Sequence, residues 1–266
     1  MTDHFPVCVV AGRKFDAARC CAIVLKRSTL HGSRSTKAMN AWKNNELLAV
    51  PAYSPAEAAR ILSVNYTTLM YWIAGRRYNS ALIKLASDIP PELSFTNLIE
   101  CHALKALTVR YYLKMRRIRS GLETLKKMFK SEHPLLDKRF RTDGIDLFLQ
   151  ESRESAPVNL SKGGQLALRE IVDMYLERVV WNADGLVKYY PFVYKEQPNE
   201  PKIISMTPMI AFGKSVIDGT GISTAVIASR FAAREDPKAL AQEYGRSEQE
   251  IWEAIRWEGE YRKAAA

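Results

Sequence analysis

The chain has 266 residues, of which 47% are hydrophobic, and a formal net charge of +10 at pH 7. This length allows two or three small domains, and the composition is that of a globular protein rather than a disordered chain. No run of apolar residues approaches 18, which excludes a membrane-spanning helix.

The positive charge is unevenly distributed. Residues 105–141 contain twelve Lys and Arg against three acids, whereas residues 142–266 are close to neutral or acidic. This asymmetry indicates a nucleic-acid-binding half and a protein-binding half. The four cysteines, Cys8, Cys20, Cys21 and Cys101, form neither a disulfide framework nor a zinc motif, which favours a reduced, cytoplasmic protein.

Residues 1–44 are difficult to interpret as a domain. Their short apolar runs alternate with polar segments such as HGSRSTK, and their basic composition imitates a transit peptide. We expect residues 1–44 to be a disordered or misannotated extension.

Residues 53–77 predict a helix-turn-helix. Ser54 and Pro55 suit the start of a first helix, and Asn65 can cap a second helix whose Leu69 and Trp72 point inward. The outer face of this second helix would lie in the major groove of DNA. An alternative is a short helical hairpin packed inside another kind of domain.

Further elements follow between residues 78 and 150. We expect a wing hairpin over 78–85, a strand leading into a helix that begins near Ser94, and another helix from Ser120 to His133. The Asp143-Gly144 turn predicts a hairpin over 139–149. Together, residues 45–150 form the predicted winged helix-turn-helix domain.

The second half contains a linker and then a helical bundle. Residues 151–161 are the candidate linker, 162–180 an amphipathic helix, and 179–181 and 186–194 two strands joined by Asp184-Gly185. From residue 205 to 266 we expect three short helices, the third opened by a capping box, Ser247 to Glu250. The predicted boundaries therefore lie at 150/151 and 204/205.

The helix-turn-helix resembles the start of MerR-type winged helices. The residues that carry the resemblance are Tyr53-Ser54, Glu57-Ala58-Ala59, Thr68-Leu69 and Tyr71-Trp72. The resemblance implies DNA binding. No long coiled-coil helix and no effector-binding domain of the MerR kind follow.

A second resemblance covers Met206–Arg256. This stretch is similar to the small helical antitoxin domain encoded beside PIN-like toxins, and the matching residues are Pro208, Ile210, Gly213, Ile217, Gly219, Thr220, Ile222, Leu240, Ala241, Tyr244, Ile251, Ala254 and Ile255. Ser215 and Gly221 depart from the family pattern. The resemblance implies a VapB-type antitoxin whose C-terminal domain binds a toxin protein.

The predicted DNA-binding residues come from two places. The recognition helix and the corner after it supply Asn65, Tyr66, Thr67, Met70, Tyr71, Arg76 and Arg77. The basic run that spans Arg110 to Arg119, interleaved with Tyr111 and Tyr112, supplies Arg116 and Arg117, which would contact the phosphate backbone. A solvated helix face is an equally good interpretation of this run.

The predicted partner-binding residues lie on the last helix. They are Trp252, Ile255 and Trp257. A short terminal helix is not expected to bury both tryptophans, so one of them should be exposed and able to bind in a groove of a partner protein.

Catalysis has little support in the sequence. Gly213, Gly219 and Gly221 fit neither nucleotide-binding glycine motif, and His102 and His133 are expected to be structural. We therefore expect no catalytic residue, no metal site and no cofactor.

These patterns together predict a mostly helical α+β protein, with an N-terminal winged helix-turn-helix and a small C-terminal three-helix domain. The predicted function is an antitoxin that neutralises a PIN-like ribonuclease and binds double-stranded operator DNA, as a homodimer, to repress its own operon. The alternative is a stand-alone transcriptional regulator whose C-terminal domain dimerises.

Overall fold

The computed structural model describes residues 9–10, 13–14, 46–76, 79–110, 113–137, 139–140, 144, 162–182, 185–193, 196–197 and 199–263. The chain divides into two compact units, Met1–Asn40 and Ala41–Ala266. In the first unit, β1 (Val9–Val10) pairs antiparallel with β2 (Arg13–Lys14). The predicted boundaries at 150/151 and 204/205 fall inside the second unit, where they remain predictions.

The helix-turn-helix forms as the sequence predicts. Helix α3 (Pro55–Ile61) is capped by Ser54, whose hydroxyl accepts a hydrogen bond from the Glu57 N–H at 3.2 Å. Helix α4 (Tyr66–Ile73) is capped by the Asn65 side chain, which accepts from the Thr67 N–H at 2.9 Å. Leu69 and Trp72 are fully buried. These caps satisfy backbone donors that a helix start leaves without partners.

A small antiparallel sheet lies beside these helices in the order β3-β5-β4. Its strands are β3 (Pro51–Tyr53), β4 (Ser87–Asp88) and β5 (Pro91–Ser94). The predicted wing hairpin over 78–85 is wrong, since the hairpin is formed by β4 and β5. Leu82 and Ile83 instead donate backbone hydrogen bonds to the Trp72 carbonyl, and both side chains are buried. These two hydrogen bonds tie the segment to the last turn of α4, so it does not pair as a hairpin.

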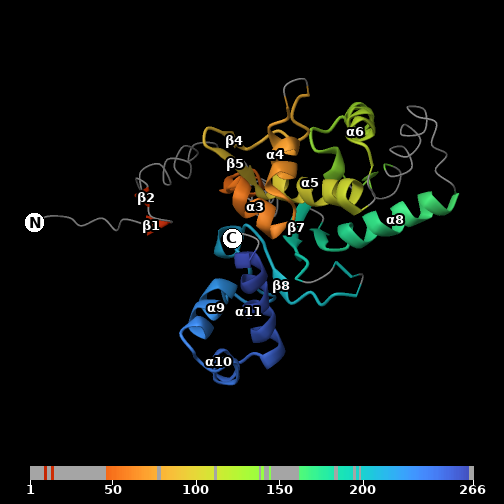
Figure 1. Ribbon diagram of the computed structural model, residues 1–266. Coiled ribbons are helices and arrows are strands. Elements are labelled where there is room, and N and C mark those ends of the chain that lie inside the picture. Colours follow the sequence, from red (N-terminus) through yellow and green to blue (C-terminus); the bar gives the residue numbers. More distant parts are fainter. Residues whose placement is uncertain are drawn as a thin grey trace, which may run out of the picture. The chain divides into compact units, whose positions relative to one another are not determined.

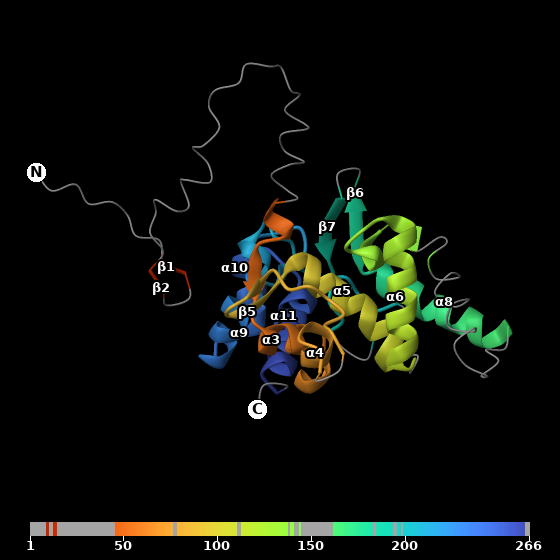
Figure 2. The ribbon, with the colours of Figure 1, turned by 90° about the horizontal axis from the view of Figure 1, so that it is seen from above.

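Helix α5 (Phe95–Lys105) occupies the centre of this region (Figure 2). It contacts β3, β5 and α8 and continues into the π-helical turn η1 (Ala106–Arg110). Ser94 and Asn97 form a capping box at its first turn. The helix therefore begins where the sequence predicts, near Ser94.

Helix α6 (Met115–Phe129) begins five residues before the predicted Ser120. Ile118, Leu122, Leu125 and Phe129 are buried at helical spacing, and this apolar stripe explains the earlier start.

The middle of the second unit combines a helix with a hairpin. Helix α8 (Lys162–Leu176) precedes β6 (Val179–Asn182) and β7 (Gly185–Tyr189), which pair antiparallel as predicted. The short 3-10 turn η2 (Pro134–Leu136) follows α6. The predicted hairpin over 139–149 is wrong where the segment is described, because Arg139, Phe140 and Gly144 have helical backbone. The candidate linker 151–161 lies outside the described residues.

The C-terminal segment contains the three expected helices (Figure 1). They are α9 (Thr224–Ala232), α10 (Pro237–Tyr244) and α11 (Glu248–Lys263), and both α9 and α10 pack on α11. Ser247 and Glu250 form the predicted capping box by reciprocal hydrogen bonds of 3.3 and 2.9 Å. Before the helices, β8 (Ile204–Ser205) pairs with β9 (Val216–Ile217) around the 3-10 turn η4 (Ala211–Gly213).

One hydrophobic core extends from Tyr53 to Trp257 and therefore includes both segments that carry a family resemblance. The Tyr53 hydroxyl donates a hydrogen bond of 2.7 Å to the Gly213 carbonyl, and Lys214 forms an ion pair with Glu57. The helix-turn-helix and the C-terminal segment are thus joined directly. The α+β, mostly helical fold that the sequence predicts is confirmed.

Candidate nucleic-acid and partner interfaces

Helix α4, the predicted recognition helix, presents a partly exposed outer face. Tyr66 has 50% of its surface exposed, Thr67 is exposed, and Met70 and Tyr71 are half-buried. Beside its first turn lies a surface hollow of about 650 Å³, lined by Ala56, Ala59, Arg60, Ser63, Val64, Asn65 and Tyr66. Alanine side chains leave this space open between α3 and α4.

The corner after α4 is held by a tight turn. Gly75 has a φ of +74°, and a Cβ atom there would lie 2.2 Å from the Asn79 carbonyl oxygen. Arg76 and Asn79 exchange backbone hydrogen bonds of 2.9 and 2.7 Å. Arg76 is therefore held beside the helix end, as predicted, while Arg77 lies outside the described residues.

Tyr71 does not project freely from α4. The guanidinium carbons of Arg76 and Arg119 lie 5.3 and 5.7 Å from the centroid of its ring. This arrangement brings the end of the recognition helix together with the first turns of α6. Sequence reasoning placed Arg119 in the basic run without selecting it as a site residue.

The basic run of α6 has two faces. Arg116 is exposed, whereas only 8% of the surface of Arg117 is exposed, and this burial argues against the prediction that Arg117 contacts phosphate. The spacing could have shown this, because Arg117 precedes Ile118 and lies four residues before the buried Gly121. Arg116 and Arg119 are three residues apart and share a helix face.

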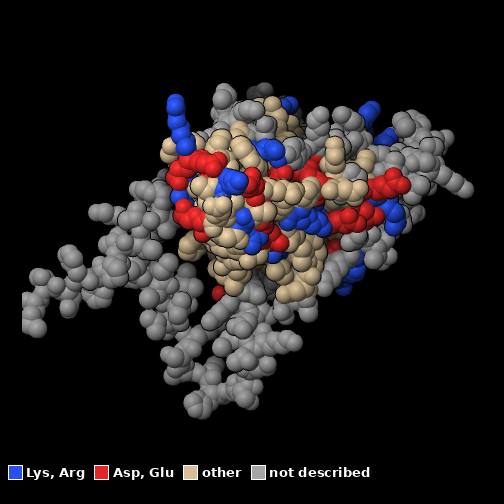
Figure 3. Space-filling model, turned by 90° about the horizontal axis from the view of Figure 1, so that it is seen from below, with Lys and Arg blue, Asp and Glu red and all other residues tan. Residues whose placement is uncertain are grey.

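The C-terminal helices present a different surface. Blue and red side chains are interspersed over this face in Figure 3. Arg230 forms ion pairs with Glu235 and Glu243 at 2.5 and 2.6 Å, and Arg246 pairs with Glu250. These contacts raise the pKa of Arg230 above its usual value, chiefly through the hydrogen bond to Glu243.

The predicted partner-binding residues separate in the structure. Trp252 is 43% exposed and contacts Phe231 edge-on, with ring centroids 5.5 Å apart. Trp257 is 4% exposed and belongs to the core, and Ile255 packs against that core. Trp257 is therefore the buried tryptophan, and the prediction that it contacts a partner is wrong, whereas Trp252 lies beside exposed Phe231 of α9.

An exposed apolar turn was not anticipated from the sequence. Phe212 is 79% exposed and Met209 58% exposed. Ala211 and Phe212 both have positive φ angles, of 49° and 51°. Left-handed backbone is costly for residues with a Cβ atom, and the Tyr53–Gly213 hydrogen bond adjoins this turn.

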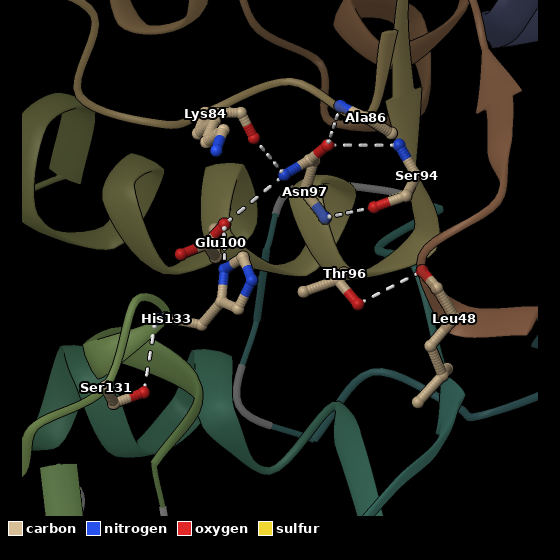
Figure 4. Close-up of polar contacts among 9 residues, drawn as sticks. All are labelled: Leu48, Lys84, Ala86, Ser94, Thr96, Asn97, Glu100, Ser131 and His133. Atoms are coloured by element: carbon tan, nitrogen blue, oxygen red, sulfur yellow. Dashed lines mark hydrogen bonds and ion pairs between the residues drawn. The ribbon is translucent and has the colours of Figure 1, made fainter. Parts of the chain in front are cut away.

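Asn97 organises a polar network at the start of α5 (Figure 4). Its side-chain oxygen accepts from the N–H groups of Ala86 and Ser94, and its amide donates to the Lys84 carbonyl. Buried Glu100 forms an ion pair of 3.1 Å with His133, which raises the pKa of that histidine. These contacts give His133 the structural role that the sequence predicts.

His102 also has a structural environment. Its ring nitrogens lie 2.9 Å from the Tyr175 carbonyl oxygen and 3.0 Å from the Tyr189 hydroxyl. Burial lowers the pKa of His102 to about 3, so the ring is neutral in the folded protein.

Over the described part of the chain, no three His, Cys, Asp or Glu side chains form a group that could hold a metal ion. Nor does any helix there have the length and apolar character to cross a membrane.

Comparisons with known proteins identify a matching family model, a relative and a solved structure. Residues 204–257 match the family model described as "Protein of unknown function (DUF433)". The chain is 27% identical over 228 residues to a protein of Mycobacterium tuberculosis named "Putative antitoxin VapB45", with 77% of this chain and 93% of that protein covered. The crystal structure of Rv2018 from Mycobacterium tuberculosis matches with a TM-score of 0.60 and 25% identity, covering 77% of this chain and 98% of that one.

Proposed function

We propose that this chain is the antitoxin of a toxin–antitoxin pair, which binds a PIN-like ribonuclease toxin and represses its own operon by binding operator DNA. The observation that carries the proposal is the similarity to the VapB45 protein. It covers 77% of this chain, which is more than either the helix-turn-helix or the C-terminal bundle contains alone. Neither a cofactor nor a catalytic step is part of the proposal, and we place its action in the cytoplasm.

The DNA-binding part of the proposal depends on α4 and the corner after it. Thr67 is exposed in the first turn of α4, where a helix that lies in the major groove meets base edges. Arg76 is exposed, and no described carboxylate forms an ion pair with it. We therefore assign Thr67 to base recognition and Arg76 to a backbone phosphate.

Gel-shift titrations with the DNA upstream of the gene test this assignment. We expect Arg76→Ala to weaken binding to every duplex and to reduce the salt slope by about 0.9, the value for one phosphate contact on duplex DNA. Thr67→Ala should change the ranking of duplexes while leaving the slope unchanged. An Arg76→Ala protein with the wild-type slope would contradict the phosphate assignment. A homodimer should protect two half-sites one helical turn apart.

The toxin-binding part depends on the exposed aromatic pair Trp252 and Phe231. Exposed aromatic residues that become buried in an interface commonly contribute ~2 kcal/mol or more each. We therefore expect Trp252→Ala to weaken toxin binding about 30-fold, the change that 2 kcal/mol produces, while the fold and DNA binding are retained.

Co-expression with the adjacent gene product, followed by co-purification and calorimetry, measures this effect. Met128→Ala is the matched control, because Met128 is 51% exposed on α6, an element distant in sequence from the aromatic pair. A wild-type protein that binds DNA but retains no neighbouring gene product would favour the alternative, a stand-alone regulator. Full toxin affinity in a folded Trp252→Ala protein would contradict the anchor assignment alone.

A further inference from the structure

The contact between the end of α4 and the start of α6 concentrates positive charge at one place. Arg76 and Arg119 both lie over the Tyr71 ring, at 5.3 and 5.7 Å from its centroid, and Arg116 lies one turn before Arg119 on α6. None of these three arginines forms an ion pair with a described carboxylate, although α6 carries Glu123 farther along. The contact that Tyr71 makes with the guanidinium groups of Arg76 and Arg119 is through its ring, which carries no negative charge to neutralise them.

Arg119 has unsatisfied hydrogen-bond donors. Its Nε and Nη2 atoms are out of contact with solvent and have no hydrogen-bond partner. Buried polar groups in folded proteins nearly always have a partner, and an arginine cannot lose its charge to avoid the cost. Arg119 as a whole is partly exposed, so a change of its side-chain rotamer can bring this edge to the surface, where it can donate to an anion in a bidentate manner.

The start of α6 adds a second, independent indication of an anion. No side chain caps this helix at Lys114, and its first turn contains no acidic residue. Instead Arg116, Arg117 and Arg119 follow, although the N-terminal end of a helix dipole disfavours cations. A helix start without a side-chain cap, beside arginines that no described carboxylate pairs, favours an anion.

We infer that Arg76, Arg119 and the first turn of α6 form a clamp for a phosphodiester of the DNA backbone, with Tyr71 holding the two guanidinium groups apart. This inference rests on the proposed function, because it requires DNA to lie along α4. It also changes the role expected for Tyr71, from reading a base to positioning Arg76 and Arg119. The clamp would extend the DNA contact from the recognition helix to α6.

The first experiment uses an anion without DNA. Titration of the full chain with sodium sulfate should raise the melting temperature with a saturable component, and that component should disappear in Arg119→Gln. Arg234→Gln is the matched control, because Arg234 is exposed in the loop between α9 and α10 and its loss should leave the component unchanged. The same sulfate response in Arg119→Gln as in wild type would overturn the anion site.

The second experiment uses duplex DNA from the upstream region and a scrambled duplex. We expect Arg119→Gln to weaken binding to both about tenfold and to lower the salt slope by about 0.9. Arg119→Lys should retain most of the slope, because the charge remains. Tyr71→Leu should retain the slope while weakening binding, which identifies a positioning role rather than a lost charge.

The outcomes separate the clamp from the proposed function. If wild-type protein shows the sulfate response but binds neither duplex, both DNA binding and the assignment of the clamp to a phosphodiester are overturned. If wild type binds DNA and Arg119→Gln keeps its affinity and slope, the clamp alone is overturned. Loss of toxin binding with unchanged DNA binding in Arg119→Gln would instead assign the site to a protein carboxylate.

Discussion

The junction of α4 and α6 and the C-terminal bundle α9–α11 both consist of helices with exposed arginines, but the arginines have opposite surroundings. On α9–α11, Arg230 and Arg246 both contact carboxylates of the same segment. At the junction of α4 and α6, Arg76, Arg116 and Arg119 have no such partner among the described residues. The arginines of the C-terminal bundle are therefore paired within their own segment, whereas those at the junction of α4 and α6 are not paired with any described carboxylate.

This difference is more informative than the net charge of +10. Surface ion pairs add little stability, so the carboxylates around Arg230 matter mainly because they cancel its field. A protein partner with an ordinary surface can then approach the bundle. Unpaired guanidinium groups beside a recognition helix instead attract a polyanion and give salt-dependent affinity.

The largest expected effect is in the core of the bundle. Trp257→Ala removes a tryptophan that is 4% exposed and should lower the free energy of unfolding by about 3–5 kcal/mol. Trp252→Ala, on the same helix but 43% exposed, should lower it by less than about 1 kcal/mol. Urea titrations followed by circular dichroism measure both values. Equal losses in the two variants would contradict the separation of core and surface on α11.

The next effect tests the connection between the two regions. At Gly213 (φ +80°) a Cβ atom would lie 2.3 Å from the Tyr53 hydroxyl, whereas at Gly219 (φ +72°) it would meet nothing within 4 Å. Gly219→Ala should cost about 1 kcal/mol, the penalty of left-handed backbone, and Gly213→Ala about 2–4 kcal/mol because the hydroxyl must also move.

Tyr53→Phe provides the control for this steric explanation. Because it removes the hydroxyl, the Gly213→Ala substitution should cost less in the Tyr53→Phe background than in wild type. Additive losses in the double variant would show that Gly213 is required for a reason other than its approach to Tyr53.

The sequence predicted those features that depend on local interactions. Ser54, Asn65 and Ser247 cap helices because each side chain reaches backbone N–H groups two or three residues away. The inward positions of Leu69 and Trp72 follow from helical spacing in the same way.

Features that depend on distant residues were not predictable. The Tyr53 hydroxyl bonds to a carbonyl 160 residues away, and no local pattern indicates that Gly213 accepts it. Periodicity could not distinguish the exposed Trp252 from the buried Trp257, because that difference depends on how α9 and α10 cover α11. Arg119 joins the DNA-binding candidates only through its contact with Tyr71, which belongs to another helix.

The pH dependence of stability should separate the buried His102 from the partly exposed His133. Since burial lowers the pKa of His102 to about 3 and the unfolded value is 6.5, this residue stabilises the fold above pH 6.5. Its contribution falls by up to about 1.4 kcal/mol per pH unit as the pH decreases toward 3. His133 has the opposite sign, because the hydrogen bond to Glu100 raises its pKa. Its contribution is complete below pH 6.5 and is lost as the pH rises through the folded value.

Urea titrations between pH 4 and 8 on His133→Gln and His102→Gln test these signs. We expect His133→Gln to remove a loss of stability above pH 6.5 and His102→Gln to reduce the slope below it. Lys126 and Glu132 also act on His133, so Glu132→Gln serves as a control with a smaller shift. The contradicting result is a His133→Gln protein whose stability keeps the wild-type pH profile above 6.5.

The smallest expected effect compares one arginine from each surface. Arg116 is exposed in the first turn of α6, where the helix dipole disfavours a cation and no carboxylate among the described residues forms an ion pair with it. Arg116→Gln should therefore raise the melting temperature by about 1–3 °C while weakening DNA binding. Arg230→Gln should lower the melting temperature, because it leaves Glu235 and Glu243 without their shared partner. Both shifts should shrink as salt is added from 0.05 to 0.5 M, since exposed charges are screened. Equal signs for the two substitutions would show that the charges at the start of α6 are as well compensated as those of the bundle, and the contrast between the two surfaces would then lose its physical basis.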